Sequence, residues 1–458
     1  MSVAERAGQA GSRRRFFVSL WRWMVPGMNV KRFVLLIALG LTILLLGFVA
    51  WARVGPQRNF FINTTARLIE LSEETGLGRW GWAALIAGSG FLLLGVGVVG
   101  LNRSLLRGLD SSPAETLERI YNRRALGRGP RIVAIGGGTG LSNLLSGLKR
   151  FSSNITAIVA VTDDGGSSGR LRTSLGMPAP GDLTDCYAAL SDSPVLAKLL
   201  LHRFERGDGL EGHTFGNVFI ATLSEERGSF RDATLSVNEI LNVRGRVLPA
   251  SLEPAVLVAE LEDGALVRGE SSLHVETQGR RVAKMRTEPA NLTAVPEALE
   301  AIRESEVIVV GPGSVYTSVI PPLLVAELAA SIRSSRALLV YICNVMTEPG
   351  ESDGLSASEH VAAITSHLGR VPDVVLVNDS PVSDTLRERY AKVGSSVVER
   401  DLDAVRSSGA QPLSLPLLKA GEAQHDPRRL AAALMRLMVA RRLRRPLTLY
   451  TGGRRITR

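Results

Sequence analysis

From residue 131 onwards, nearly continuous apolar runs alternate with segments whose apolar positions recur every three or four residues. The apolar runs span 155–162, 305–311, 337–344 and 373–378. Such runs are typical of strands buried on both faces of a parallel sheet. The segments between them with helical periodicity span 141–150, 183–206, 293–304, 318–335 and 355–369. This alternation predicts an α/β fold with a doubly wound, mostly parallel, Rossmann-like sheet.

Two later segments follow other patterns. Residues 255–288 alternate polar and apolar side chains around the turn dipeptides Asp263-Gly264 and Gln278-Gly279. This pattern predicts a β-hairpin region inserted into the α/β domain. After Leu413 the chain is mostly one helix, expected over 426–445.

Two stretches near the start of the chain, 33–51 and 80–101, contain no charged residue. As helices each would span about 30 Å, which matches the hydrocarbon core of a bilayer. A signal peptide is the alternative for the first stretch, but a small-residue cleavage site is missing and a second span follows. The sequence therefore predicts two transmembrane helices that precede the α/β domain, joined by an extracytoplasmic loop, 52–79.

The flanks of these stretches are rich in arginine. By the positive-inside rule, the basic tail 1–32 and the juxtamembrane linker 102–130 face the cytoplasm, as does the functional domain 131–458. The expected localisation is therefore the cell membrane, with two spans. Residues 1–131 hold 18 Lys and Arg against 7 Asp and Glu, which accounts for the formal charge of +10.

The remaining residues, 132–458, are therefore close to neutral, which argues against a nucleic-acid-binding surface. The last stretch, 436–458, holds eight arginines and no acidic residue. It is either a contact to anionic membrane lipid or a solvated helix end. The two cysteines, Cys186 and Cys343, lie far apart in apolar contexts, so we expect buried thiols in a reducing compartment.

A glycine-rich turn follows the first expected strand, 132–135. It consists of Gly136, Gly137, Gly138, Thr139 and Gly140, and an amphipathic helix begins directly after it. Glycines let backbone N–H groups approach an anion, and the helix N-terminus adds partial positive charge. Asn143 stands where a full dinucleotide fingerprint requires a third glycine, so a tight turn is the alternative to a phosphate loop.

The other expected strands also end in residues that suit a ligand. The run 155–162 is followed by Asp163, Asp164, Gly165, Gly166, Ser167 and Ser168, and the run 305–311 leads into Gly311, Pro312, Gly313, Ser314, Tyr316, Thr317 and Ser318. Adjacent carboxylates hold Mg²⁺ or a ribose, and hydroxyls and N–H groups bind phosphate. Asn344 and Asn378 end the next two strands, although each could simply hold its own turn.

Ligands of open α/β sheets bind outside the carboxyl ends of the strands. The convergence of these strand ends therefore predicts a nucleotide-type ligand. Asp182, at the start of an expected helix, is either a third carboxylate near Asp163 and Asp164 or a helix cap. Asn217 lies at the start of another expected helix.

Several of these motifs occur together in one known family. GGGTGLSNLLSGLKR, ITAIVAVTDDGGSSGRLR, GDLTDCYAALSD, GHTFGNVFIATL, GPGSVYTSVIPPLL and YICNVMTEPGESDG appear in this order, followed by HDP at 425–427. In these motifs the chain resembles the YvcK-type gluconeogenesis factors, a family related to the CofD-like 2-phospho-L-lactate transferases. The resemblance runs from about residue 131 to about residue 437.

The resemblance implies a regulatory protein that binds a UDP-sugar such as UDP-N-acetylglucosamine. It also implies a requirement for cell shape and wall synthesis during growth on gluconeogenic carbon, and an unidentified protein partner in wall-precursor metabolism. It allows for a homo-oligomer. In the related transferases, the positions of Asp163, Asp164 and Asp182 are associated with Mg²⁺ and the transferred phosphate, and the glycine loops hold the nucleotide.

Two departures from the family pattern bear on the ligand. The transferases have a GPSNP-like loop at the position of Gly311 to Val315, so this chain is more similar to the YvcK side. Relatives often have a basic residue at the position of Gln424, and Tyr390 remains the expected stacking partner for the nucleotide. An Mg²⁺-dependent transferase acting on a nucleotide donor is the first alternative, and a nicotinamide-dependent oxidoreductase with Asp163 on the ribose is the second.

Overall fold

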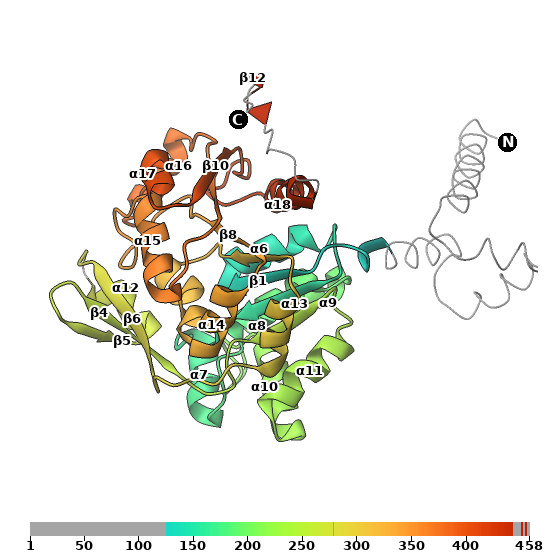
Figure 1. The fold of residues 1–458 in the computed structure, drawn as a ribbon. Helices are drawn as coiled ribbons and strands as arrows, with labels where there is room; N and C mark the ends of the chain where they lie inside the picture. Colours follow the sequence, from blue (N-terminus) through green and yellow to red (C-terminus); the bar gives the residue numbers. More distant parts are fainter. Residues whose placement is uncertain (1–124, 278, 443–449, 452–453, 456–458) are drawn as a thin grey trace, which may run out of the picture. The chain divides into compact units, whose positions relative to one another are not determined.

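The computed structural model describes residues 125–277, 279–442, 450–451 and 454–455. At its centre lies a parallel sheet with the strand order β10-β9-β8-β7-β1-β2-β3 (Figure 1). The strands are β1 (Ile132–Gly136), β2 (Ile155–Val159), β3 (Arg246–Pro249), β7 (Val307–Val310), β8 (Leu338–Ile342), β9 (Val374–Asn378) and β10 (Gln411–Leu415). The predicted α/β fold with a parallel, Rossmann-like sheet is confirmed for this part of the chain.

The order in which strands are added reverses between β1 and β7. From β1 the chain first builds outwards through β2 and β3, and then returns to place β7 on the other side of β1. Residues 132–135 of β1 pair in parallel with residues 307–310 of β7. In open α/β sheets such a reversal leaves a crevice at the carboxyl ends of the two strands, where ligands bind.

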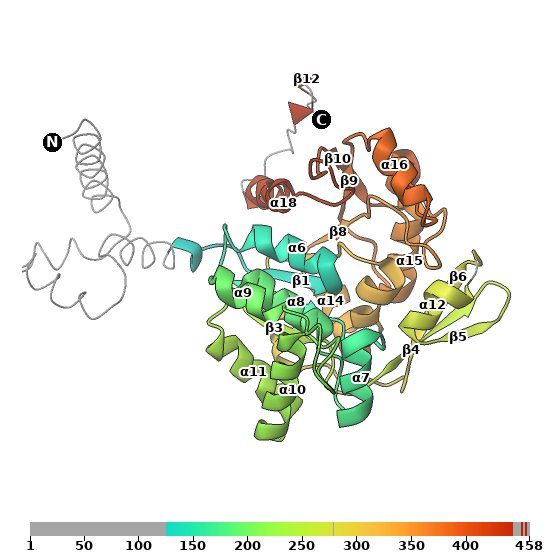
Figure 2. The same ribbon diagram turned by 180° about the vertical axis from the view of Figure 1, so that it is seen from behind.

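Helices cover both faces of the sheet (Figures 1 and 2). One face is packed by α6 (Gly138–Leu148), α8 (Gly181–Leu190), α9 (Pro194–Leu200), α10 (Phe215–Arg227), α11 (Phe230–Ile240) and α18 (Pro427–Arg442). The other is packed by α13 (Pro296–Glu304), α14 (Ala326–Ser334), α15 (Ala357–Leu368) and α17 (Leu402–Ser407). Each strand contributes apolar residues to both packed layers, and this is why the strands appear in the sequence as nearly continuous apolar runs.

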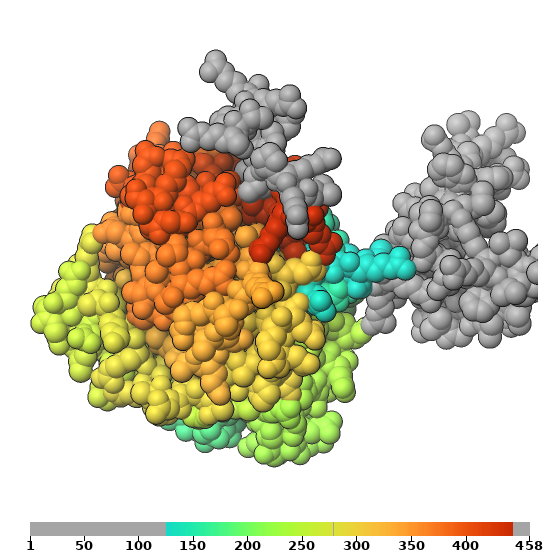
Figure 3. All heavy atoms as spheres, in the orientation of Figure 1, coloured from blue at the N-terminus to red at the C-terminus, as the bar shows by residue number. Residues whose placement is uncertain are grey.

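The insert between β3 and α13 is a three-stranded antiparallel sheet of order β5-β4-β6. It comprises β4 (Val256–Leu261), β5 (Leu266–Arg268), α12 (Glu270–Glu276) and β6 (Val282–Glu288). The predicted hairpin at Asp263-Gly264 joins β4 and β5, but α12 separates β5 from β6, so Gln278-Gly279 does not join two strands. In the space-filling view the insert lies against the orange surface of residues 340–400 (Figure 3).

Proline residues explain where the helix boundaries differ from expectation. The expected helix 183–206 is two helices, and Ser193 caps the second while Pro194 begins it. The expected helix 318–335 starts as a π-helical turn, Val315–Val319, and a 3₁₀ turn, Pro321–Leu324, before α14. The strand β10, which the sequence did not predict, contains Pro412 and lies at the sheet edge, where a missing N–H is tolerated.

The expected membrane localisation needs correction. Within the described part of the chain, every helix is too short or too polar to cross a bilayer. The two-span localisation therefore has no support from this structure. The stretches 33–51 and 80–101, on which it was based, lie outside the described residues, as do the tail, loop and most of the linker around them.

Contact between α6 and α18 generates a prediction for Gly147. A Cβ at this position would overlap the carbonyl group of Pro427 and lie 3.1 Å from the Cβ of Ala431. We expect Gly147→Ala to lower the free energy of unfolding by about 1–3 kcal/mol, although alanine normally favours a helix. Urea denaturation of the full chain measures this, with Ser142→Ala at a half-buried position of α6 as the control. Equal stability of the two variants would contradict the packing of α6 on α18.

Candidate functional site

A cavity of about 430 Å³ opens at the carboxyl ends of β1, β7 and β8, at the point where the strand order reverses. Its walls come from the turns after these three strands, from α16 (Asp384–Ala391) and from residues 423–425. The structure places in this wall the sequence candidates Gly137, Thr139, Gly140, Pro312, Gly313, Ser314, Ser318, Asn344 and Tyr390. Candidates from four distant segments therefore face one space.

Close backbone contacts explain the glycines of the first turn. A Cβ at Gly137 would overlap the carboxylate of Asp182, and one at Gly140 would overlap the carbonyl of Pro312. Gly138 has a φ of +58°, a left-handed conformation that side chains disfavour. Only glycine therefore lets the start of α6 approach both α8 and the loop after β7.

The N-terminus of α6 is open to the cavity. Gly137 is its N-cap residue and has no side chain to cap the helix, although the Asp182 carboxyl accepts a hydrogen bond from the backbone of Gly138. The first N–H groups of a helix have no partner within the helix and carry partial positive charge. Gly137, Thr139 and Gly140 line the cavity at this end, so the cavity floor suits an anion such as phosphate.

Asn143 closes the cavity on its far side. This residue occupies the position at which a dinucleotide fingerprint has its third glycine, and its Nδ2 donates to the carbonyl oxygen of His425 at 2.6 Å. Both residues line the cavity. The side chain of Asn143 therefore ties α6 to the segment that precedes α18, a role that glycine could not fill.

Tyr390 and Gln424 lie on the outer wall. Tyr390 is partly buried against a small apolar cluster that includes Val345, Met346 and Ala423. Burial lowers the pKa of His425 to about 4, so this neighbour is neutral at physiological pH. The described residues that line the cavity include no lysine or arginine, and Glu348 is the one acidic residue among them.

Carboxylates gather behind the glycine turn. Burial, followed by the charges of Asp163 and Asp185, raises the pKa of Asp182 to about 7, and a hydrogen bond from the backbone of Gly138 lowers it. Burial and the charge of Asp163 also raise the pKa of Glu270 to about 9. At neutral pH Glu270 is therefore protonated and Asp182 is partly protonated, and a bound cation would favour the ionised forms of both.

Magnesium fits this cluster only as an ion shared with a ligand. Asp163 Oδ1 already accepts from the N–H of Gly165 at 2.8 Å, and Asp164 Oδ1 accepts from the N–H of Ser271 in α12 at 2.9 Å. Within the described residues no group of three His, Cys, Asp or Glu side chains is arranged to hold a metal ion. Mg²⁺ is, however, commonly held by one or two carboxylates together with phosphate and water.

Several candidates near the second strand take part in a buried polar network. Ser167 Oγ lies 2.9 Å from His213 Nδ1, and Asn217 Nδ2 donates to Ser167 Oγ at 3.0 Å and to Ser168 Oγ at 3.4 Å. These contacts fasten α7 (Gly166–Leu175) to α10. Gly165 and Gly166 form the start of α7, and like the network residues they do not line the cavity.

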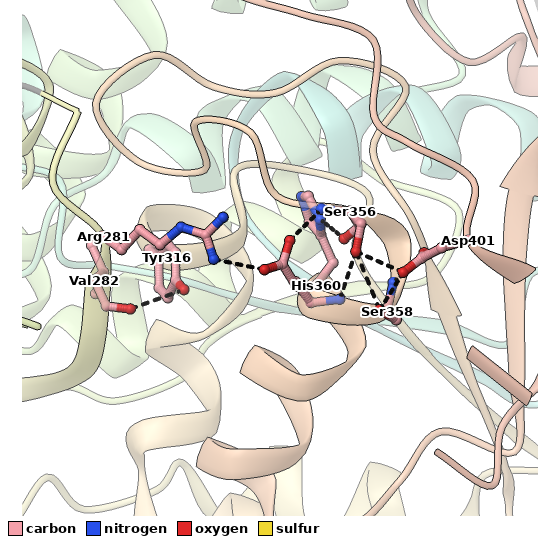
Figure 4. Close-up of polar contacts among 8 residues, drawn as sticks. Arg281, Val282, Tyr316, Ser356, Ser358, His360 and Asp401 are labelled. Atoms are coloured by element: carbon pink, nitrogen blue, oxygen red, sulfur yellow. Dashed lines mark hydrogen bonds and ion pairs between the residues drawn. The ribbon is translucent and has the colours of Figure 1, made fainter. Parts of the chain in front are cut away.

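Two candidates after β7 point away from the cavity. Tyr316 Oη donates to the carbonyl oxygen of Val282 in the insert at 3.3 Å (Figure 4). Nearby, Ser356 Oγ donates to Asp401 at 2.8 Å, so this region fixes the insert and α15 in place. Thr317 Oγ1 donates to the buried Glu351 at 3.0 Å.

The remaining candidates hold backbone. Gly136 is the last residue of β1. Gly311 begins the loop after β7 and has a φ of +78°. Asn378 Oδ1 accepts from the N–H groups of Ser380 at 3.2 Å and Leu417 at 3.1 Å. Asn378 therefore holds its own turn, which was the alternative to a ligand contact.

Sequence reasoning missed three contributors. In the sequence, Asn143 stood out only because it replaces the third glycine of the dinucleotide fingerprint. That replacement was the one sign that this position has another role. Ser395 follows α16 in a segment without a motif. Glu270 was assigned to a hairpin because the short helix α12 has no apolar periodicity that distinguishes it from a strand.

The geometry can be compared with known proteins. Residues 132–418 match the family model described as 2-phospho-L-lactate transferase CofD. The "Gluconeogenesis factor" of Bacillus subtilis is 41% identical over 317 residues, which cover 68% of this chain and 99% of that protein. The "Putative gluconeogenesis factor" of Deinococcus radiodurans is 48% identical over 420 residues, or 91% of this chain and 89% of that protein.

A solved structure agrees. A UPF0052-family protein from Bacillus halodurans, whose crystal structure is known, is 44% identical in sequence. The match covers 67% of this chain and 99% of that protein's chain, with a TM-score of 0.65. The chain belongs to the CofD-like family and, within it, to the YvcK-type gluconeogenesis factors.

Proposed function

We propose that this protein binds a UDP-sugar, of the UDP-N-acetylglucosamine type, and acts as a regulator. The observation that carries the proposal is the cavity of about 430 Å³ formed by both glycine loops at the reversal of strand order. Its volume lies in the range of about 300–1,000 Å³ that is usual for small-molecule sites. Hydroxyl and amide groups of Thr139, Ser318 and Asn344 are available to hydrogen-bond a sugar nucleotide.

The two ends of the cavity suit the two chemical parts of such a ligand. The diphosphate is expected over Gly137–Gly140, where the N-terminus of α6 is open. The uracil base or the sugar is expected against the ring of Tyr390, which also lines the cavity. Because the lining residues include no lysine or arginine, the diphosphate needs a cation, and Mg²⁺ shared with Asp163 and Asp182 is the ion we propose.

The regulatory role rests on the nature of the relatives. Proteins that are 41% and 48% identical carry the name gluconeogenesis factor. We therefore propose that the protein supports cell-wall synthesis and cell shape during growth on gluconeogenic carbon, through a protein partner in wall-precursor metabolism. Ligand binding would report the supply of wall precursor to that partner.

A second candidate function follows from the carboxylates. The matching family model is that of a transferase, and the charges of Asp163 and Asp182 add to burial in raising the pKa of Glu270. With Mg²⁺ bound, this cluster would stabilise charge that develops on a transferred phosphoryl group. The alternative is therefore an Mg²⁺-dependent transferase of the 2-phospho-L-lactate type with a nucleotide donor.

Substitutions of Tyr390 test whether its ring stacks on the ligand. Stacking of an aromatic ring on a base is worth about 1–3 kcal/mol, so Tyr390→Ala should raise the Kd for UDP-N-acetylglucosamine at least about tenfold. Tyr390→Phe keeps the ring and should stay within about threefold of wild type. Calorimetry on the full chain measures both values. Equal effects of the two substitutions would remove the ring from the binding site.

The pH dependence of ligand binding tests whether Asp182 holds the proposed Mg²⁺. The pKa of Asp182 is raised to about 7, so the carboxyl group is protonated below that pH and ionised above it. Mg²⁺ binds the ionised form. The increase in UDP-sugar affinity that Mg²⁺ causes should therefore fade as pH drops from 8 to 6, and Asp182→Asn should abolish both the increase and its pH dependence. An Mg²⁺ effect that persists in Asp182→Asn would place the ion elsewhere.

Turnover separates the regulator from the transferase. We expect purified full-length protein with Mg²⁺ to leave UDP-N-acetylglucosamine unconsumed, while Asp163→Asn weakens binding and in-cell complementation together. Chromatography of the nucleotide over time measures consumption. Sustained, Mg²⁺-dependent consumption that Asp163→Asn eliminates would instead favour the transferase.

A further inference from the structure

The insert contacts one wall of the cavity through α12. The loop after β8 contributes residues 347–349 to that wall. Thr277 Oγ1 at the end of α12 donates to the carbonyl oxygen of Gly350 at 2.7 Å, and His274 Nδ1 lies 3.1 Å from the carbonyl oxygen of Pro349. A Cβ at Gly350 would overlap the backbone of His274. The helix of the insert and the loop that walls the cavity are therefore in direct contact.

The contact with Pro349 determines where the imidazole of His274 holds its proton. A carbonyl oxygen only accepts hydrogen bonds, so Nδ1 carries a hydrogen. The other ring nitrogen, Nε2, lies 3.5 Å from Oε1 of Glu351. In a neutral ring with this tautomer, Nε2 presents a lone pair. The two side chains therefore attract each other only when a proton lies between them, held either by the ring or by the carboxyl group.

Glu351 is buried where its own loop meets the insert and the turn after β7. Its Oε1 accepts from Thr317 Oγ1 at 3.0 Å, and its Oε2 is buried without a hydrogen-bond partner among the described residues. An ionised carboxylate is poorly stabilised in such a place. Burial raises the pKa of Glu351 to about 7, against the opposing effect of His274. The carboxyl group is therefore mostly protonated below neutral pH and mostly ionised above it.

The charged and titratable side chains on the surrounding elements do not replace this proton. They include Glu270 on α12, Glu348 and Asp353 in the loop itself, Tyr316 in the turn after β7, and Arg281 before β6. Burial raises the pKa of Glu270 to about 9 and that of Tyr316 to about 12, so both are neutral near pH 7. Arg281 is paired with Glu359 at 2.6 Å.

We propose that His274 and Glu351 are positioning residues of the ligand site. A proton shared between them holds α12 on the loop after β8, and so keeps residues 347–349 in place as a wall of the cavity. Loss of the proton leaves a carboxylate facing a lone pair and loosens this wall. The affinity for a UDP-sugar then depends on the insert, although the described residues of the insert do not line the cavity. The inference rests on the proposed function, because it concerns the affinity for the same ligand.

The variant Glu351→Gln separates the proton from the packing. Glutamine has the size of a protonated glutamate, and its amide can donate to the His274 lone pair at every pH. Because the pKa of Glu351 is raised, the contact is complete at low pH and is lost as pH rises through about 7. We expect the Kd values of wild type and Glu351→Gln for UDP-N-acetylglucosamine to agree within about twofold at pH 6. At pH 8, wild type should bind at least about fivefold more weakly than the variant.

Calorimetry on the full chain with saturating Mg²⁺ measures the ratio of the two Kd values at each pH. The titration of Asp182 affects both proteins alike and cancels in this ratio. Glu276→Gln is the matched control, since Glu276 is exposed on α12 and does not line the cavity. Its Kd should equal that of wild type at both pH values. His274→Ala should weaken binding at pH 6 at least about threefold, because it removes the contact in both protonation states.

The outcomes separate this inference from the proposed function. If UDP-N-acetylglucosamine binds but the ratio for Glu351→Gln is the same at pH 6 and pH 8, the shared proton is wrong and the proposed function stands. If wild type does not bind at either pH, the proposed function fails together with the effect on affinity. Hydrogen exchange of residues 270–277 in the ligand-free protein at pH 8 then tests the contact alone. Exchange should be slower in Glu351→Gln than in wild type, and equal exchange would contradict the contact.

Discussion

The close approach of three chain segments at the end of β1 determines the rest of the site. The start of α6 lies against the carboxylate of Asp182 on one side and against the Pro312 carbonyl on the other, and a Cβ at Gly137 or Gly140 would overlap them. This approach brings the turn after β1, the loop after β7 and the start of α8 around one space. Both the proposed phosphate site and the neighbouring carboxylates depend on it.

Charge is separated around this contact. The cavity has hydroxyls, amides and an open helix terminus but no lysine or arginine among its described lining residues, whereas carboxylates with raised pKa values lie behind the glycine turn. A ligand that carries phosphate and accepts a shared cation would match both regions.

Much of the α/β fold could be predicted because a strand buried on both faces leaves a plain signature. Four of the seven strands of the parallel sheet lie in the predicted apolar runs and β1 precedes the glycine turn, whereas β3 and β10 are edge strands that each contain a proline. The site was less predictable, because a strand end shows which residues are near the crevice but not where they point. Tyr316 shares a loop with cavity residues, yet its hydrogen bond holds the insert. Asn217 lies on α10, where its hydrogen bond to Ser167 joins that helix to α7.

Hydrogen–deuterium exchange of the full chain, with and without UDP-N-acetylglucosamine and Mg²⁺, tests the central claim most directly. If the ligand lies over the open start of α6, exchange should slow in residues 137–143 and 313–318. The hairpin of β4 and β5, whose residues do not line the cavity, should be unchanged. Slowed exchange confined to other segments, or none at saturating ligand, would contradict the account.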